Sequence, residues 1–154
     1  MSYLIALFIN YQVINFLNYA IHRWVQHPGP TSHSELHHKV YNRSRHTSRR
    51  FKWLGYVARA ELLYLIPMFT LVPGAFYFFD WQLALALCVQ LVLHVFAFNF
   101  FHINFHRRKG FLQSFRWFRS LKALHTIHHR STHTNFSVFD FSFDYLFGTL
   151  VKPR

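Results

Sequence analysis

Three kinds of residue are scarce in this chain of 154 residues, and each shortage excludes a class of protein. A single cysteine, Cys88, excludes a disulfide scaffold, and five glycines exclude a collagen-like chain. Five acidic residues are too few for a di-iron bundle built from carboxylates, which uses several Glu residues and paired Glu-x-x-His motifs. Because 52% of the residues are apolar, a disordered basic tail is excluded as well.

The residues in excess are cations and histidines. The chain carries 17 Lys and Arg residues, a net charge of +12 and 13 histidines. This composition leaves two broad possibilities: the protein binds nucleic acid, or it lies in a membrane and holds metal. The positions of these residues along the chain decide between the two.

Lys and Arg are absent from residues 1–22 and 60–106. These gaps contain three apolar segments, 3–21, 62–79 and 81–101, each close to the roughly 20 residues with which a helix crosses a bilayer. The first is the weakest candidate, because its amide side chains oppose insertion into the membrane. These are Asn10, Gln12, Asn15 and Asn18. We therefore expect an all-α integral membrane protein with about three transmembrane helices, and no nucleic-acid partner.

The cations form two blocks, one after the first span and one after the third. A tight hairpin around Asp80 joins the second and third spans, so both blocks fall on the same side of the membrane. The positive-inside rule makes that side cytoplasmic. We expect residues 1–154 to form one multi-pass domain in a bacterial inner membrane or the endoplasmic reticulum. Its cytoplasmic, helical, His-rich cap would comprise residues 22–59 and 102–154.

Twelve of the 13 histidines lie in or beside these blocks, and ten of them form four short motifs. The motifs are HX4H (His22, His27), HX3HH (His33, His37, His38), HX3H (His102, His106) and HX2HH (His125, His128, His129). Helical residues three and four apart share a face, so the last three motifs are each predicted to present their imidazoles on one side of a helix. The i, i+5 pair of the first motif is looser. Imidazole binds Fe, Zn, Cu and Ni, and ten imidazoles suit two metal ions better than one.

Other polar residues near the motifs are candidates for orienting the ligands. Asp144, His133 and Glu35 are predicted to support the imidazoles, and Asp140, four residues before Asp144, is a weaker candidate. Two further histidines, His46 and His94, are expected to be ordinary surface or core residues.

The segment 107–124 is predicted to form one amphipathic helix. Phe111, Phe115, Phe118 and Leu121 would lie on one face, and Arg116, Arg119 and Lys122 on another. Such a helix lies in the membrane interface, with its cations toward anionic headgroups.

The ordered set of motifs resembles the fatty acid hydroxylase/sterol desaturase superfamily over most of the chain. The segment from Tyr19 to His27 is similar to its opening YWxHRxxH-type motif, His33–His38 to its HX2-3HH motif, and Phe101–Asn104 to its H-x-N segment. The closing HxxHH, NFG and WDxxFGT run is matched by residues 125–129, 134–136 and 143–149, with Ser137 in place of the NFG glycine.

The resemblance implies a non-haem di-iron centre held by the ten histidines of the four motifs, with zinc as a substitute in purified protein. It also implies O2-dependent oxidation of a lipid C–H bond, with electrons from a separate cytochrome b5-like or ferredoxin-like donor. Hydroxylation is favoured over desaturation, and fatty acyl, sterol and carotenoid substrates remain open. The alternative is an inactive or non-enzymatic membrane protein of the same fold that binds metal or acts as a scaffold.

Overall fold

The computed structural model describes residues 3–29, 31, 33–42, 47, 78 and 80–153, without the side chains of Glu35 and Leu36. These residues contain helices and no β-strand, which confirms the all-α class for the described part. The α-helices are α1 (Tyr3–Ile21), α2 (His38–Val40), α4 (Trp81–Phe105), α5 (Arg116–Arg130) and α6 (Ser142–Leu146). The described residues also form two π-helices, η1 (His22–Gln26) and η2 (His33–His37), and one 3-10 helix, η4 (Phe111–Ser114).

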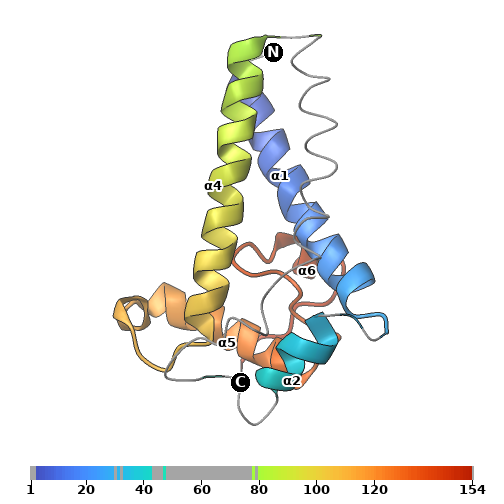
Figure 1. Ribbon diagram of the computed structural model, residues 1–154, viewed down its shortest axis with the longest axis vertical. Coiled ribbons are helices and arrows are strands. Elements are labelled where there is room, and N and C mark those ends of the chain that lie inside the picture. Colours follow the sequence, from blue (N-terminus) through green and yellow to red (C-terminus); the bar gives the residue numbers. More distant parts are fainter. Residues whose placement is uncertain are drawn as a thin grey trace.

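Two long helices, α1 and α4, run side by side along the long axis of the molecule (Figure 1). They coincide with the first and third predicted spans, except that α4 continues four residues further, to Phe105. Residues 3–26 and 81–105 are long and apolar enough to cross a membrane. Only 22% and 17% of their most apolar windows are buried, whereas the core helix of a soluble protein is mostly buried. The predicted span 62–79 lies outside the described residues, apart from Phe78.

Three of the four amides that weaken α1 as a membrane span bond to groups within the protein. Asn10 Nδ2 donates to Gln90 Oε1 of α4 at 2.7 Å, and Gln90 Nε2 donates to the Leu7 carbonyl at 2.9 Å. Further down, Asn18 Nδ2 donates to His94 Nε2 at 2.8 Å. These bonds remove much of the cost of placing the amides in an apolar medium, because a polar group in hydrocarbon is expensive only when it lacks a partner.

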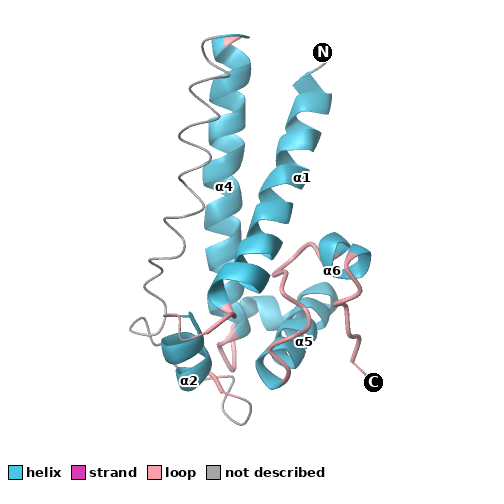
Figure 2. Cartoon of the chain, turned by 90° about the vertical axis from the view of Figure 1, so that its right-hand side faces the viewer, coloured by secondary structure: helices cyan, strands magenta, loops and turns pink. Residues whose placement is uncertain are grey.

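The shorter elements gather at the lower end of α1 and α4, as two perpendicular views show (Figure 1, Figure 2). Here Phe105 of α4, Phe118 of α5 and Val138 of the following segment form a buried apolar cluster. Their burial fixes α5 beneath α4 by the removal of apolar surface from water. The histidine motifs lie at this end, because His22 follows α1 directly and His102 is in the last turn of α4.

The predicted helix 107–124 is wrong in its extent. A turn follows α4, η4 covers Phe111–Ser114, and α5 begins only at Arg116. The aromatic residues also divide, since Phe118 is fully buried whereas Phe111 is 78% exposed. The sequence pattern missed this because Phe111 and Phe118 belong to different helices and share no continuous face.

Candidate metal centre

The structure brings the ten histidines of the four motifs together in two groups of five. The outer cluster consists of His22, His27, His33, His38 and His128, and the inner cluster of His37, His102, His106, His125 and His129. Within each cluster the ligand atoms lie within 4.8 Å of one another. All five members of the inner cluster are buried, whereas three of the outer cluster are partly accessible.

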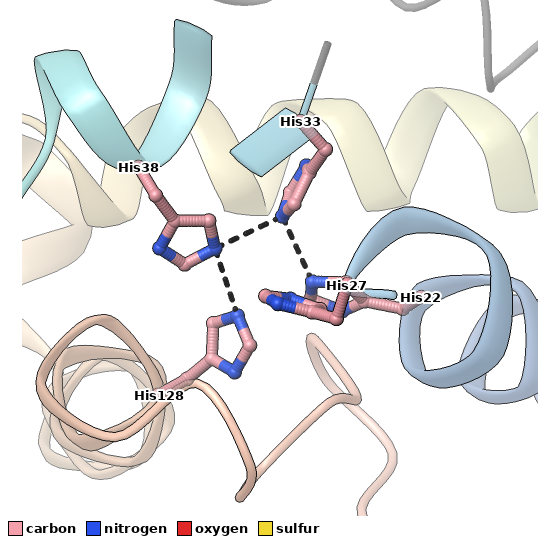
Figure 3. Close-up of side chains that lie close together, drawn as sticks. All are labelled: His22, His27, His33, His38 and His128. Atoms are coloured by element: carbon pink, nitrogen blue, oxygen red, sulfur yellow. Dashed lines mark hydrogen bonds between the residues drawn. The ribbon is translucent and has the colours of Figure 1, made fainter. Parts of the chain in front are cut away.

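The rings of the outer cluster come from η1 with its C-cap, from η2 with α2, and from α5, and they point toward a shared centre (Figure 3). In both clusters neighbouring Nε2 atoms lie 3.0–3.2 Å apart. An imidazole nitrogen binds zinc at about 2.0–2.1 Å, so two such ligands at right angles lie about 3 Å apart. The observed spacing therefore fits ligands around one ion as well as hydrogen bonds between imidazoles.

Each His-His doublet contributes one ring to each cluster. His38 belongs to the outer cluster and His37 to the inner cluster. In the same way, His128 belongs to the outer cluster and His129 to the inner cluster. Adjacent helical residues point about 100° apart, so the two rings of a doublet cannot face the same centre. The prediction that HX3HH and HX2HH each present one face is wrong in this respect. Because the ring centroids of His38 and His129 are 4.4 Å apart, the clusters are direct neighbours.

The π-helical turns explain the i, i+5 spacing that sequence analysis treated as loose. His22 and His27 span η1 and its C-cap, and His33 and His38 span η2 and the start of α2. In a π-helix the hydrogen bond runs from i to i+5, so residues five apart lie one above the other. Both pairs consequently reach the outer cluster. Single π-turns are frequent at functional sites.

Backbone carbonyls fix the orientation of three rings. The Nδ1–H groups of these rings donate to main-chain oxygens: His22 to Phe136, His128 to Thr134 at 2.8 Å and His129 to Tyr41. A carbonyl only accepts, so Nδ1 carries the proton of each neutral ring and Nε2 presents a lone pair. Each lone pair is directed into its cluster, as a metal ligand requires.

The protons available cannot satisfy the contacts of the outer cluster. Its Nε2 atoms form the chain His22–His33–His38–His128, with three contacts. The two end rings have no proton on Nε2, and each middle ring has at most one. At most two contacts are therefore hydrogen bonds, and the third brings two ring nitrogens together without a shared proton. A bound cation removes this conflict.

His27 provides a second sign that the residues fit a metal. Its Nε2 is buried and has no hydrogen-bond partner within the described structure, although the ring lies in the outer cluster. An unsatisfied buried polar atom costs about 1–3 kcal/mol. A metal ion bound by the cluster would satisfy it.

Burial favours the uncharged form of seven of the clustered imidazoles. Desolvation, reinforced by neighbouring imidazoles, lowers the pKa of His27 to about 2 and that of His38 to about 3. The same causes hold several others well below the ordinary pKa of 6.5: His33, His37, His125, His128 and His129. Neutral imidazole is the form that binds metal.

Asp144 acts on the outer cluster through the backbone, and this corrects the expectation that it accepts from an imidazole. Its fully buried carboxylate accepts from Phe136 N at 2.8 Å, Ser137 N at 2.9 Å and Thr149 Oγ1 at 2.7 Å. The Phe136 carbonyl in turn accepts from His22. The carboxylate therefore holds the segment that orients the ring.

Asp140 bonds to α1 rather than to an imidazole. Its Oδ2 accepts from Tyr11 Oη at 3.0 Å and from Asn15 Nδ2 at 3.1 Å, and its Oδ1 accepts from Ser142 N at 3.0 Å. It thereby ties the C-terminal segment to the side of α1. His94 bonds to Asn18 and lies outside both clusters, as expected of a core histidine.

The remaining candidates belong to neither cluster or lie outside the described residues. His133 is exposed and belongs to neither cluster, so its predicted support of a ligand is not seen. The side chain of Glu35 and the whole of His46 lie outside the described part of the chain.

Asn135 positions the segment that orients the rings, a role that the sequence alone did not indicate. Its backbone has φ 52°, in the left-handed region, which asparagine tolerates better than most residues. Its buried side chain donates to the carbonyls of Leu124 and Val151 at 3.0 and 2.9 Å, and accepts from Val151 N at 2.7 Å. These bonds tie the segment whose carbonyls orient His22 and His128 to Leu124 of α5 and to Val151. In the sequence, only its place in the NFG-like motif could have indicated this role.

Comparison with known families gives a match to the fatty acid hydroxylase family over residues 7–149. Comparison with curated proteins and with solved structures gives no significant match. The matched range includes all ten clustered histidines, most of the first apolar helix, all of the second, and the residues whose carbonyls orient the rings. The chain therefore belongs to the fatty acid hydroxylase family, in the fatty acid hydroxylase/sterol desaturase superfamily that its motifs resemble.

Proposed function

We propose that this protein is a membrane-bound non-haem di-iron oxidoreductase that uses O2 to hydroxylate a C–H bond of a lipid, with the ten clustered histidines as iron ligands. The observation that carries the proposal is the pair of adjoining five-imidazole clusters in a chain of the fatty acid hydroxylase family. A fatty acyl chain is the first substrate to test, with sterols and carotenoids after it.

The donor set favours iron over zinc. Structural zinc is tetrahedral and usually recruits thiolates, whereas each cluster offers five neutral nitrogens and no sulfur. Bound iron supplies the activation of O2, with the balance R–H + O2 + 2 e⁻ + 2 H⁺ → R–OH + H2O. Zinc can occupy such a site as a substitute in purified protein.

The protein's own residues prepare the site in two ways. Backbone carbonyls direct the Nε2 lone pairs of His22, His128 and His129 inward, and burial keeps the inner cluster away from water. The clusters lie where the apolar α1 and α4 end, so a lipid chain packed along these helices reaches them without entering water. We place this end of the molecule on the cytoplasmic side, following the positive-inside rule.

Metal analysis and lipid profiling test the proposal together. The protein purified in detergent should contain about two irons per chain, and an expressing host supplied with an electron donor should accumulate a hydroxylated lipid. His128→Ala should lose iron from the outer cluster and abolish the product. His133→Ala, which changes an exposed histidine on the same side of the chain, should preserve both.

Two results would contradict the proposal. Protein with no iron, or with a single zinc, excludes the di-iron centre. A lipid profile that is the same in wild type, His128→Ala and empty host would instead support a metal-binding scaffold without catalytic activity.

A further inference from the structure

A basic groove of about 800 Å³ lies along α5 on the side away from the histidine clusters. Its cations come from the turn after α4, from α5 and from the C-terminal segment. They are Arg108, Arg119, Lys122, Arg130 and Lys152. No acidic residue is among the described residues that line it. The groove therefore presents a concentrated positive field to whatever approaches it.

The cations of the groove are of two kinds. Arg119 Nη1 donates to the carbonyls of Gln113 and Ser114, and Lys122 Nζ donates to a carbonyl of the turn, so both help to hold the fold. Arg108, Arg130 and Lys152 are exposed and make no hydrogen bond or ion pair within the described chain. Three cations are thus available to a partner.

The groove lies directly behind the inner cluster. Thr126 and Arg130 line it, and each follows a ligand candidate in sequence, His125 and His129. The thickness of one helix, roughly 10–12 Å with side chains, therefore separates a molecule in the groove from the inner cluster. A protein-bound redox group seated there would be close to the proposed irons without touching them.

The opposite face of α5 identifies the side that meets the membrane. Trp117 is exposed on that face, and it contacts the exposed N-cap Phe115, which in turn contacts the exposed Phe111 of η4. Trp117 and Thr126 are nine residues apart, which places them on opposite sides of the helix at about 100° per residue. Exposed aromatic residues are typical of the membrane interface. The groove consequently faces water, and the C-terminal segment that lines it lies at the end of the molecule opposite the start of α4 (Figure 1).

We propose that this groove is the docking surface for an acidic single-electron carrier protein. The inference rests on the proposed function and adds the place and the charge of its redox partner. Two reduced carriers dock in turn and each gives up one electron; with two protons, one oxygen atom of O2 leaves as water and the other becomes the hydroxyl. Such a partner fits better than a lipid headgroup, because the groove is turned away from the aromatic face.

Binding to purified carriers tests the proposal. Full-length, iron-loaded protein in nanodiscs of phosphatidylcholine is titrated with the soluble haem domain of cytochrome b5, which is acidic, and with basic cytochrome c. Arg108→Glu combined with Lys152→Glu should raise the Kd for the acidic carrier about tenfold or more at low salt, and the difference should shrink at high salt. The same pair should not weaken the binding of cytochrome c.

A matched control is Lys39→Glu combined with Arg116→Glu, which changes the net charge equally at exposed positions outside the groove. Its Kd for the acidic carrier should stay within twofold of wild type. Equal losses in both pairs, or no loss in either, would overturn the docking surface. So would a loss of binding to phosphatidylglycerol vesicles with unchanged binding of the acidic carrier.

A second measurement separates this inference from the proposed function. Lipid product formed with dithionite as the electron source reports on oxidation without any carrier. If product forms and the groove pair binds the carrier like wild type, the docking surface fails alone. If the groove pair binds more weakly but no variant forms product with dithionite, the proposed oxidation fails while the docking surface stands.

Discussion

Asp144 is a buried carboxylate whose hydrogen bonds all serve the backbone and one hydroxyl. Both of its oxygens accept, so replacing one by an amide NH2 sets a donor against a donor. We expect Asp144→Asn to lower the free energy of unfolding by about 2–3 kcal/mol, the scale of hydrogen bonds to a charged group together with a buried group left unpaired. Thermal or denaturant unfolding in detergent measures this.

The same substitution should affect the two clusters unequally. Thr134 and Phe136, whose carbonyls orient His128 and His22, belong to the segment that Asp144 holds, and both rings lie in the outer cluster. Iron content should therefore fall from about two toward one per chain. Asp80→Asn is the control, because asparagine caps a helix as well as aspartate does. Full iron content and unchanged stability in Asp144→Asn would refute this role.

At the residue scale, the spacing of the histidines predicted which of them come together but not how they are divided between the two clusters. Spacing along a helix indicated shared faces, and His102 with His106 follows that rule. His37 and His38 do not, because the division of a doublet depends on where α4 and α5 lie in space, which local periodicity does not contain. Carbonyl partners such as Phe136 escape sequence analysis altogether, since every residue has a carbonyl.

The two long helices were predicted well because their signal is an uninterrupted apolar run. α1 begins and ends as expected, and α4 begins at Trp81, after the N-cap Asp80. The α5 region was predicted poorly, because the amphipathic pattern continues across the turn that follows α4. Local hydrophobic periodicity does not reveal a chain reversal that tertiary packing of Phe118 stabilises.

The contact between α1 and α4 depends on Gln90, which both accepts from Asn10 and donates to the Leu7 carbonyl. We expect Gln90→Leu to destabilise the protein by about 0.6–1.7 kcal/mol, from the average to the largest value measured for hydrogen bonds between membrane helices. The loss arises because Asn10 is left without its acceptor. Thermal unfolding in nanodiscs checks the change.

Gln12 offers a matched control on α1. It is equally a glutamine in an apolar helix, but its side chain makes no hydrogen bond within the described chain. Gln12→Leu should leave stability unchanged or raise it slightly, because a polar group is removed from an apolar face. If Gln12→Leu costs as much as Gln90→Leu, the hydrogen bonds of Gln90 do not stabilise the helix pair.

At the scale of the whole molecule, burying many imidazoles in one place makes stability depend on pH. The folded-state pKa of seven clustered histidines lies below 6.5: it is about 2 for His27 and about 3 for His38, and well below 6.5 for His33, His37, His125, His128 and His129. Between these values and 6.5 the unfolded chain binds protons that the folded, metal-free chain does not. Acid therefore favours unfolding: stability is complete above pH 6.5 and is lost as the pH falls below it.

Each such histidine lowers the free energy of unfolding by about 1.4 kcal/mol for each pH unit of acidification in that window. The metal-free protein should therefore lose stability steeply between about pH 6.5 and pH 5. His27→Ala removes one titrating group and should flatten the slope by about that amount. Val25→Ala, at an exposed neighbouring position without a titrating group, should shift stability slightly and keep the slope. Denaturant unfolding of chelator-treated protein at several pH values measures all three slopes. Equal slopes for wild type and His27→Ala would mean that His27 is protonated alike in both states, and so is not buried as a neutral imidazole.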